Sequence, residues 1–172
     1  MEANDTMIRK APCSSALPEL EVPMINTMVA CLGVEHRKLN ALDMRLAVAA
    51  SRLADDPGAI TASQQALRVW NEIQHGLWSH LQIEDELVFS WGESHHAISD
   101  VLVETLKNDR EEMRKLMATL YELSPGADRK QTVEDRSTFA QTLLALARTL
   151  DSHVERYDGG VLPAILRALF HK

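Results

Sequence analysis

The sequence predicts an all-α protein in which four long helices form an up-down-up-down bundle, followed by a short C-terminal helix. Aromatic residues make up only 5% of the 172-residue chain and glycines number 7, a composition that favours helices over sheets. Apolar residues recur at spacings of three and four along four long stretches, and short breaker segments separate these stretches. Amphipathic helices joined by short connections typically pack as antiparallel neighbours around one core.

The first helix is expected to follow an N-terminal arm. Residues 1–20 are polar and contain prolines, so we expect a mobile arm there and a single domain over residues 21–172. After Pro23, an apolar stripe with helical spacing covers positions 28–53. The Asp-Asp-Pro-Gly segment at residues 55–58 should end this helix.

The second helix is expected to begin just after this breaker. Thr61 or Ser63 can cap its N-terminus, because a hydroxyl there accepts a hydrogen bond from a free backbone N–H group. Its apolar stripe covers positions 67–87, and the helix should stop near Trp91 and Gly92.

The third and fourth helices complete the predicted bundle. The third carries apolar residues over positions 103–120 and should end at the Ser-Pro-Gly segment of residues 124–126. The fourth is expected to begin at about Thr132 and to be broken near residues 159–160, both of which are glycines. A short helix should then resume over residues 161–169.

An internal repeat relates the second helix to the fourth. His80 is followed by an acid five residues later, Asp85, and by apolar residues at plus eight and plus nine. His153 has the same pattern, with its acid at Asp158. Each of these two helices therefore supplies an imidazole and a nearby carboxylate.

The repeat extends to the first and third helices. The segment around His36 aligns with the segment around Arg110, and the two residues precede their following histidines, His80 and His153, by 44 and 43 positions. Each half of the chain thus pairs one polar residue in its first helix with the imidazole and acid of its second helix.

The repeat places several of these polar side chains on the apolar stripes, which face the core. They are His36, His80, Glu84, Arg110 and His153. A buried carboxylate is costly unless it is paired or bound to a metal. Each histidine alone could be a hydrogen-bonded core residue, and Asp158 could be a surface acid. Together, however, imidazoles and carboxylates that converge in one core are the donors that a divalent metal needs.

The arrangement resembles the hemerythrin-like, or HHE cation-binding, family. The matching residues are Glu35-His36 in the first helix, His80-x3-Glu84 in the second, and His153-x4-Asp158 in the fourth. The resemblance covers about residues 25–165 and implies a four-helix bundle around a non-haem di-iron centre. It also implies that His36 and His80 hold one ion, that Glu84 and Asp158 bridge two ions, and that His153 serves the second ion.

The chain departs from the pattern of that family at two positions. The third helix normally donates a histidine, but the repeat places Arg110 there, and arginine has no free lone pair for a metal. Tyr157 stands four residues after His153, where a glutamate is expected; we expect it to pack. Three states therefore remain open: a full di-iron site, a site for one ion, and a metal-free centre in which Arg110 pairs with Glu84 or Asp158.

Three classes of function remain open as well. The first is a non-enzymatic binding protein that holds iron and a small diatomic ligand such as oxygen or nitric oxide, for sensing or for iron sequestration. The second is a redox enzyme acting on peroxide or nitric oxide, although no residue requires catalysis. The third is a metal-free bundle used for protein contacts. A homo-oligomer is compatible with each.

Charge and cysteine content limit the other partners. The formal net charge of −7 argues against binding to nucleic acid or to an anionic membrane surface, and no apolar run reaches the length of a membrane span. Cys13 and Cys31 form neither a disulfide framework nor a zinc-finger spacing, so we expect reduced thiols and a cytoplasmic location. His75 and Asp109 are expected to face solvent.

Overall fold

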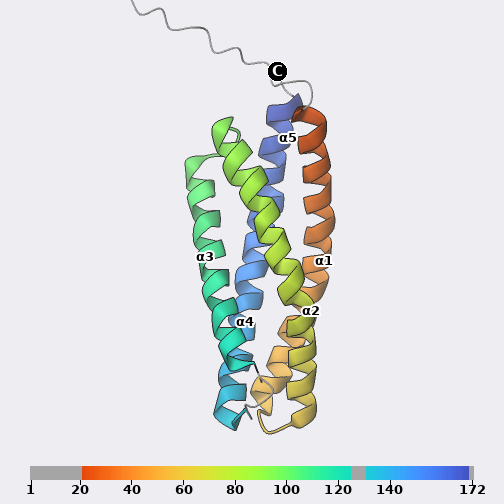
Figure 1. The fold of residues 1–172 in the computed structure, drawn as a ribbon, viewed down its shortest axis with the longest axis vertical. Coiled ribbons are helices and arrows are strands. Elements are labelled where there is room, and N and C mark those ends of the chain that lie inside the picture. The colour runs from red at the N-terminus through yellow and green to blue at the C-terminus, as the bar shows by residue number, and fades with distance from the viewer. Residues whose placement is uncertain (1–20, 125–130, 171–172) are drawn as a thin grey trace, which may run out of the picture.

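The computed structural model describes residues 21–124 and 131–170, and the expected N-terminal arm lies outside them. Four long helices run alternately up and down along the long axis of the molecule, as Figure 1 shows, which confirms the predicted all-α fold. In chain order they are α1 (Glu21–Asp55), α2 (Ile60–Glu84), α3 (Asp100–Leu123) and α4 (Val133–Arg156), and the short α5 (Leu162–Phe170) extends α4. Helix α1 packs against α2 and α4, and α3 packs against α4.

The N-terminus of α4 lies where the sequence placed it. Thr132 is the residue that caps this helix: its hydroxyl accepts a hydrogen bond from the Asp135 backbone N–H group, and the Asp135 carboxylate accepts one from the Thr132 N–H group. This reciprocal capping box satisfies two backbone donors that the helix itself leaves free.

The predicted caps of α2 were wrong. The helix begins at Ile60, before both Thr61 and Ser63, and its capping residue is Ala59, which has no side chain able to accept a hydrogen bond. The preceding turn is instead closed by the Asp56 carboxylate, which accepts a hydrogen bond from the Gly58 backbone N–H group at 3.1 Å. The side-chain hydrogen bond before α2 therefore comes from the Asp-Asp-Pro-Gly segment and not from the first residues of the helix.

Two segments with π-helical geometry follow α2 and α4. The first, η1, spans Asp85–Gly92, and the second, η2, spans Tyr157–Val161. The expected break at residues 159–160 was therefore wrong, because the chain stays helical there but takes a wider turn, with the Leu162 backbone N–H group bonded to the Tyr157 carbonyl oxygen. At Gly160 a Cβ atom would come within 2.8 Å of the Leu102 side chain, so glycine permits close contact with α3.

The apolar core has two parts, one on each side of a polar layer. One cluster contains residues such as Leu39, Leu77, Met113 and Leu150. The other contains residues such as Leu32, Leu106, Tyr157 and Val161. Along α1 and α3 the chain passes from one cluster to the other at His36 and Arg110, and on α2 and α4 it does so just after His80 and His153.

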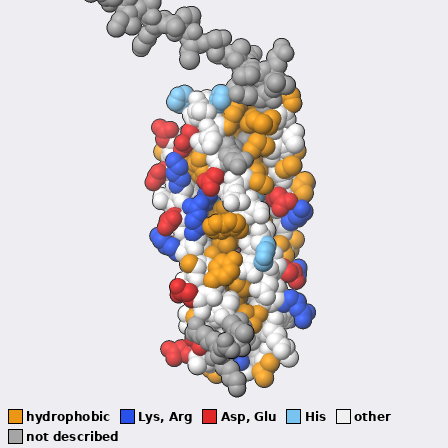
Figure 2. All heavy atoms as spheres, viewed as in Figure 1, with side chains coloured by type: hydrophobic (Ala, Val, Ile, Leu, Met, Phe, Trp, Pro, Cys, Tyr) orange, Lys and Arg blue, Asp and Glu red, His pale blue; other side chains and the backbone are white. Residues whose placement is uncertain are grey.

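The surface has mixed character. Acidic and basic side chains are interspersed on the face drawn in Figure 2, with apolar side chains between them. Cys31, a free thiol, is exposed on α1. Within the described residues, no helix is both long enough and apolar enough to cross a membrane.

Candidate metal centre

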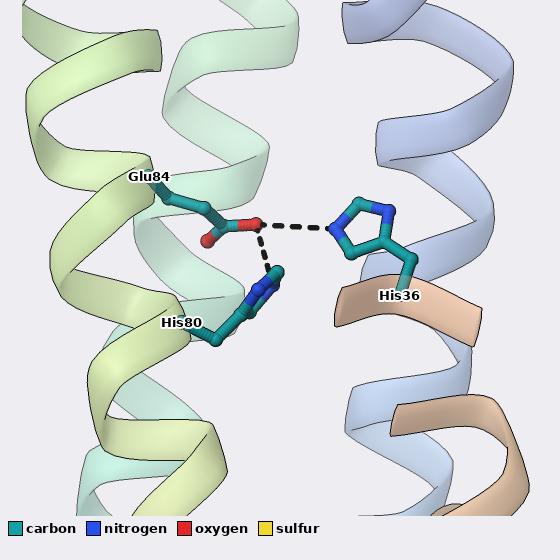
Figure 3. Close-up of side chains that lie close together, drawn as sticks. All are labelled: His36, His80 and Glu84. Atoms are coloured by element: carbon teal, nitrogen blue, oxygen red, sulfur yellow. Dashed lines mark ion pairs between the residues drawn. The ribbon is translucent and has the colours of Figure 1, made fainter. Parts of the chain in front are cut away.

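The polar layer brings together side chains from all four long helices. His36 comes from α1, His80 and Glu84 from α2, Arg110 from α3 and His153 from α4, and each is at most 2% exposed. Figure 3 shows His36 reaching from α1 toward the carboxylate of Glu84, while His80 reaches it from one turn earlier on α2. The repeat in the sequence therefore corresponds to one shared level in the bundle.

Glu84 is the centre of this layer. Its Oε1 atom lies 2.9 Å from His153 Nε2, 3.0 Å from His80 Nε2 and 3.8 Å from His36 Nε2. The second carboxylate oxygen lies 3.1 Å from the same nitrogen of His153. One carboxylate thus meets three imidazoles, and all four side chains are buried.

The surroundings of Glu84 favour its charged form. Burial alone would raise the pKa of this carboxyl, but the charge of His153, its hydrogen bonds to the carboxylate and the close approach of His36 and His80 together hold the pKa well below its ordinary value. Burial likewise opposes protonation of His36, yet the nearby carboxylates of Glu84 and Asp158, the latter hydrogen-bonded to Nδ1, leave the pKa of that imidazole raised. The raised pKa of His36 favours a proton on that imidazole, opposite the charge of Glu84.

Three of these residues meet the requirement of a cation site most closely. His36, His80 and Glu84 each offer a donor atom, and these atoms lie within 4.8 Å of one another; the described residues contain no second group of this kind. Neither nitrogen of His80 has a hydrogen bond of good geometry, and Nε2 of His36 also lacks one. Buried polar atoms are seldom left unpaired, so these nitrogens fit a cation that the protein would bind there.

Asp158 lies on the other side of the His36 ring. Its Oδ1 atom is 2.6 Å from His36 Nδ1, whereas Nε2 of the same ring faces Glu84, and its side chain is 46% exposed. An α-helix would turn Asp158 away from His153, and the wider turn of η2 changes its direction. The structure does not bring Asp158 to Glu84, and its ligand role stays a prediction.

Arg110 has a different partner from Glu84 and Asp158, the two considered for a metal-free centre. Arg110 points inward as expected, but its Nη1 atom lies 2.5 Å from Asp85 Oδ1 and its Nη2 atom donates to the Leu81 carbonyl oxygen at 2.8 Å. Glu84 is not its partner, because the imidazoles already surround that carboxylate. In this structure Arg110 therefore does not neutralise Glu84 or Asp158 in place of a metal.

Tyr157 packs into the site as expected. Its side chain is fully buried, its ring meets the His36 ring edge-on at 4.8 Å, and its hydroxyl has no hydrogen-bond partner. Burial, followed by the charge of Glu84, raises the pKa of this phenol above its ordinary value. Tyr157 therefore contributes a neutral hydroxyl to the layer.

Asp109 has a larger part in the site than the sequence indicated. It is only 16% exposed, forms an ion pair with Arg156, and its Oδ2 atom lies 3.9 Å from His153 Nδ1, on the side of that ring away from Glu84. The alignment of Asp109-Arg110 with Glu35-His36 carried no sign of this contact. His75, in contrast, is exposed as expected.

A protein-family model matches most of the chain. The family model described as "Hemerythrin HHE cation binding domain" matches residues 27–165, which include the whole polar layer. No curated protein and no solved structure matches the chain.

Proposed function

Because the chain belongs to the hemerythrin HHE cation-binding family, we propose that its polar layer holds non-haem iron and that the iron-loaded protein binds a small diatomic ligand. The observation that carries this proposal is the buried meeting of His36, His80 and Glu84. A binding protein that senses oxygen or nitric oxide, or that sequesters iron, needs no further group.

The donor set matches the metal. Two imidazoles and one carboxylate are the ligands that mononuclear non-haem iron(II) sites use while leaving other positions open. Bound iron would supply a redox-active Lewis acid at that point. The apolar clusters above and below the layer keep bulk water away from it.

Neighbouring side chains would orient these donors. A carboxylate on Nδ1 of a histidine holds the proton there and leaves Nε2 free for a metal, and Asp158 has this position against His36. His153 bonds both oxygens of Glu84 and so fixes the plane of its carboxylate. We propose that Asp158 and His153 act first through these contacts, and that direct ligation by either one is a second role.

Two alternatives differ in what they require. A redox enzyme acting on peroxide or nitric oxide would need turnover, which the residues present do not demand. A metal-free bundle would need a positive charge beside Glu84. Arg110 pairs with Asp85 and not with Glu84, so this alternative depends on a proton held by His36, whose pKa is raised.

Metal analysis tests the proposal directly. Protein purified without chelator should contain iron, and the apoprotein should take up iron(II) anaerobically. His80→Ala should abolish uptake, whereas His75→Ala, five residues earlier on the exposed face of α2, should not. Iron at a hundred times its dissociation constant should stabilise the fold by about 2.7 kcal/mol. Equal iron content in the two variants would refute the site.

A further inference from the structure

We infer that the bundle contains a second, pseudo-symmetric half-site in which the Arg110 guanidinium takes the place of an ion, so that the protein holds one cation rather than two. This inference rests on the function proposed above and adds to it the number of metal ions that each chain binds. It begins from the internal repeat, because residues that correspond in the two halves of the sequence also make corresponding contacts in the structure.

The two halves supply equivalent positions. Each set has four members. The first three are the polar residue of the first helix in that half, the histidine of its second helix, and the residue four positions after this histidine. The fourth is an acid from the other half, five positions after the histidine there. The first set is His36, His80, Glu84 and Asp158, and the second is Arg110, His153, Tyr157 and Asp85.

The strongest sign of equivalence is a pair of crossed contacts. His36 of the first half bonds Asp158 of the second half at 2.6 Å, and Arg110 of the second half bonds Asp85 of the first half at 2.5 Å. Both acids lie in the π-helical segments that follow the histidine helices, at the first residue of η1 and the second of η2. Arg110 and His36 therefore occupy matching places in the bundle.

Only the first half retains a set of metal donors. In the second half, arginine replaces the imidazole of the first helix, and the phenol of Tyr157 replaces a carboxylate. His153 remains, but its Nε2 atom is directed at Glu84. The described residues accordingly contain one group of three metal donors, and it belongs to the first half.

The guanidinium also excludes a second ion electrostatically. Arg110 is 2% exposed and is held by Asp85 and by the Leu81 carbonyl oxygen, so its positive charge cannot move out to solvent. A divalent cation beside it would meet this fixed like charge, which Asp85 offsets only in part because half of the Asp85 side chain is exposed to solvent. Arginine stays protonated in proteins, so this exclusion persists at every physiological pH.

Titration of the apoprotein with cobalt(II) alone tests the inference, with bound metal counted by elemental analysis. The wild type should saturate at one ion per chain. Arg110→His removes the fixed charge and restores an imidazole, and this variant should saturate at two. Arg114→His is the matched control: Arg114 lies one turn away, is 42% exposed and reaches the same Asp85, yet its replacement should leave the number at one.

The outcomes separate this inference from the proposed function. If the wild type binds one ion and folded Arg110→His also binds one, the inference fails while the metal site stands. If the wild type binds two ions, the inference is overturned without any variant, including the case in which Arg110→His does not fold. If the wild type binds none, the proposed function fails as well. Far-ultraviolet circular dichroism checks that each variant is helical.

Discussion

The ion pair between Arg110 and Asp85 should respond very unequally to the loss of its two partners. Arg110 is 2% exposed, whereas the Asp85 side chain is 50% exposed. Asp85→Asn leaves a buried guanidinium facing a neutral amide. Arg110→Met keeps an apolar side chain of similar length and leaves a carboxylate that water can solvate.

The burial of each partner sets the magnitude. Breaking a buried pair by removing one member typically costs 3–5 kcal/mol, and because Asp85 is half-exposed we take about 2–3 kcal/mol for Asp85→Asn. For a domain of this size that loss lowers the melting temperature by about 4–12 °C. Arg110→Met should cost less than about 1 kcal/mol, because the remaining Asp85 carboxylate stays in contact with solvent and still lies 3.6 Å from the Arg114 guanidinium.

Urea unfolding of the metal-free protein, followed by circular dichroism, measures these differences. The double variant Arg110→Met/Asp85→Asn should recover most of the stability that Asp85→Asn loses, because no charge is then left unpaired in the core. If Arg110→Met proved as destabilising as Asp85→Asn, the account of Arg110 as a charge held by Asp85 would be refuted.

Three further predictions concern positions outside the group formed by His36, His80 and Glu84. Burial raises the pKa of Asp43 from 3.8 to about 6, so its charge opposes folding above that pH; Asp43→Asn should stabilise the protein at pH 7 by about 1 kcal/mol after allowance for solvent screening. This gain should vanish at pH 3.5, and an equal gain at both pH values in thermal unfolding would contradict the argument. Gly160→Ala should give a lower melting temperature than Gly159→Ala, because its methyl group would meet the Leu102 Cδ2 atom at 2.8 Å and displace that flexible side chain, whereas nothing lies within 4 Å at Gly159; equal melting temperatures would contradict the argument. Thr132→Ala removes the cap of α4 and should cost about 1 kcal/mol in urea unfolding; no loss would mean that the cap is dispensable.

The fold and the inward direction of the polar residues were predictable from the sequence. Apolar spacing located all four long helices, and the repeat placed His36, His80, Arg110 and His153 at one level, where the structure also has them. These features follow from the period of an α-helix, which local sequence encodes well. The family assignment followed from the same residues and is confirmed by the family match.

The pairing within the layer could not be predicted in the same way. The choice of Asp85 over Glu84 as the partner of Arg110 depends on how three imidazoles surround Glu84, which is a tertiary property. The direction of Asp158 depends on the π-helical turn, and no local residue pattern distinguishes that turn from an ordinary glycine break. The repeat did contain a usable signal, because Asp85 and Asp158 occupy equivalent positions in it.

The polar layer also has a consequence for how the helices are aligned along their axes. A helix that slipped by one turn, about 5.4 Å, would move its charged or imidazole side chain among leucines and set a leucine against Glu84. Aliphatic side chains alone tolerate such slippage, since one leucine can replace another. A single level of hydrogen-bonded groups thus selects one vertical alignment, and the apolar residues on either side are left free to vary in identity while the bundle keeps its register.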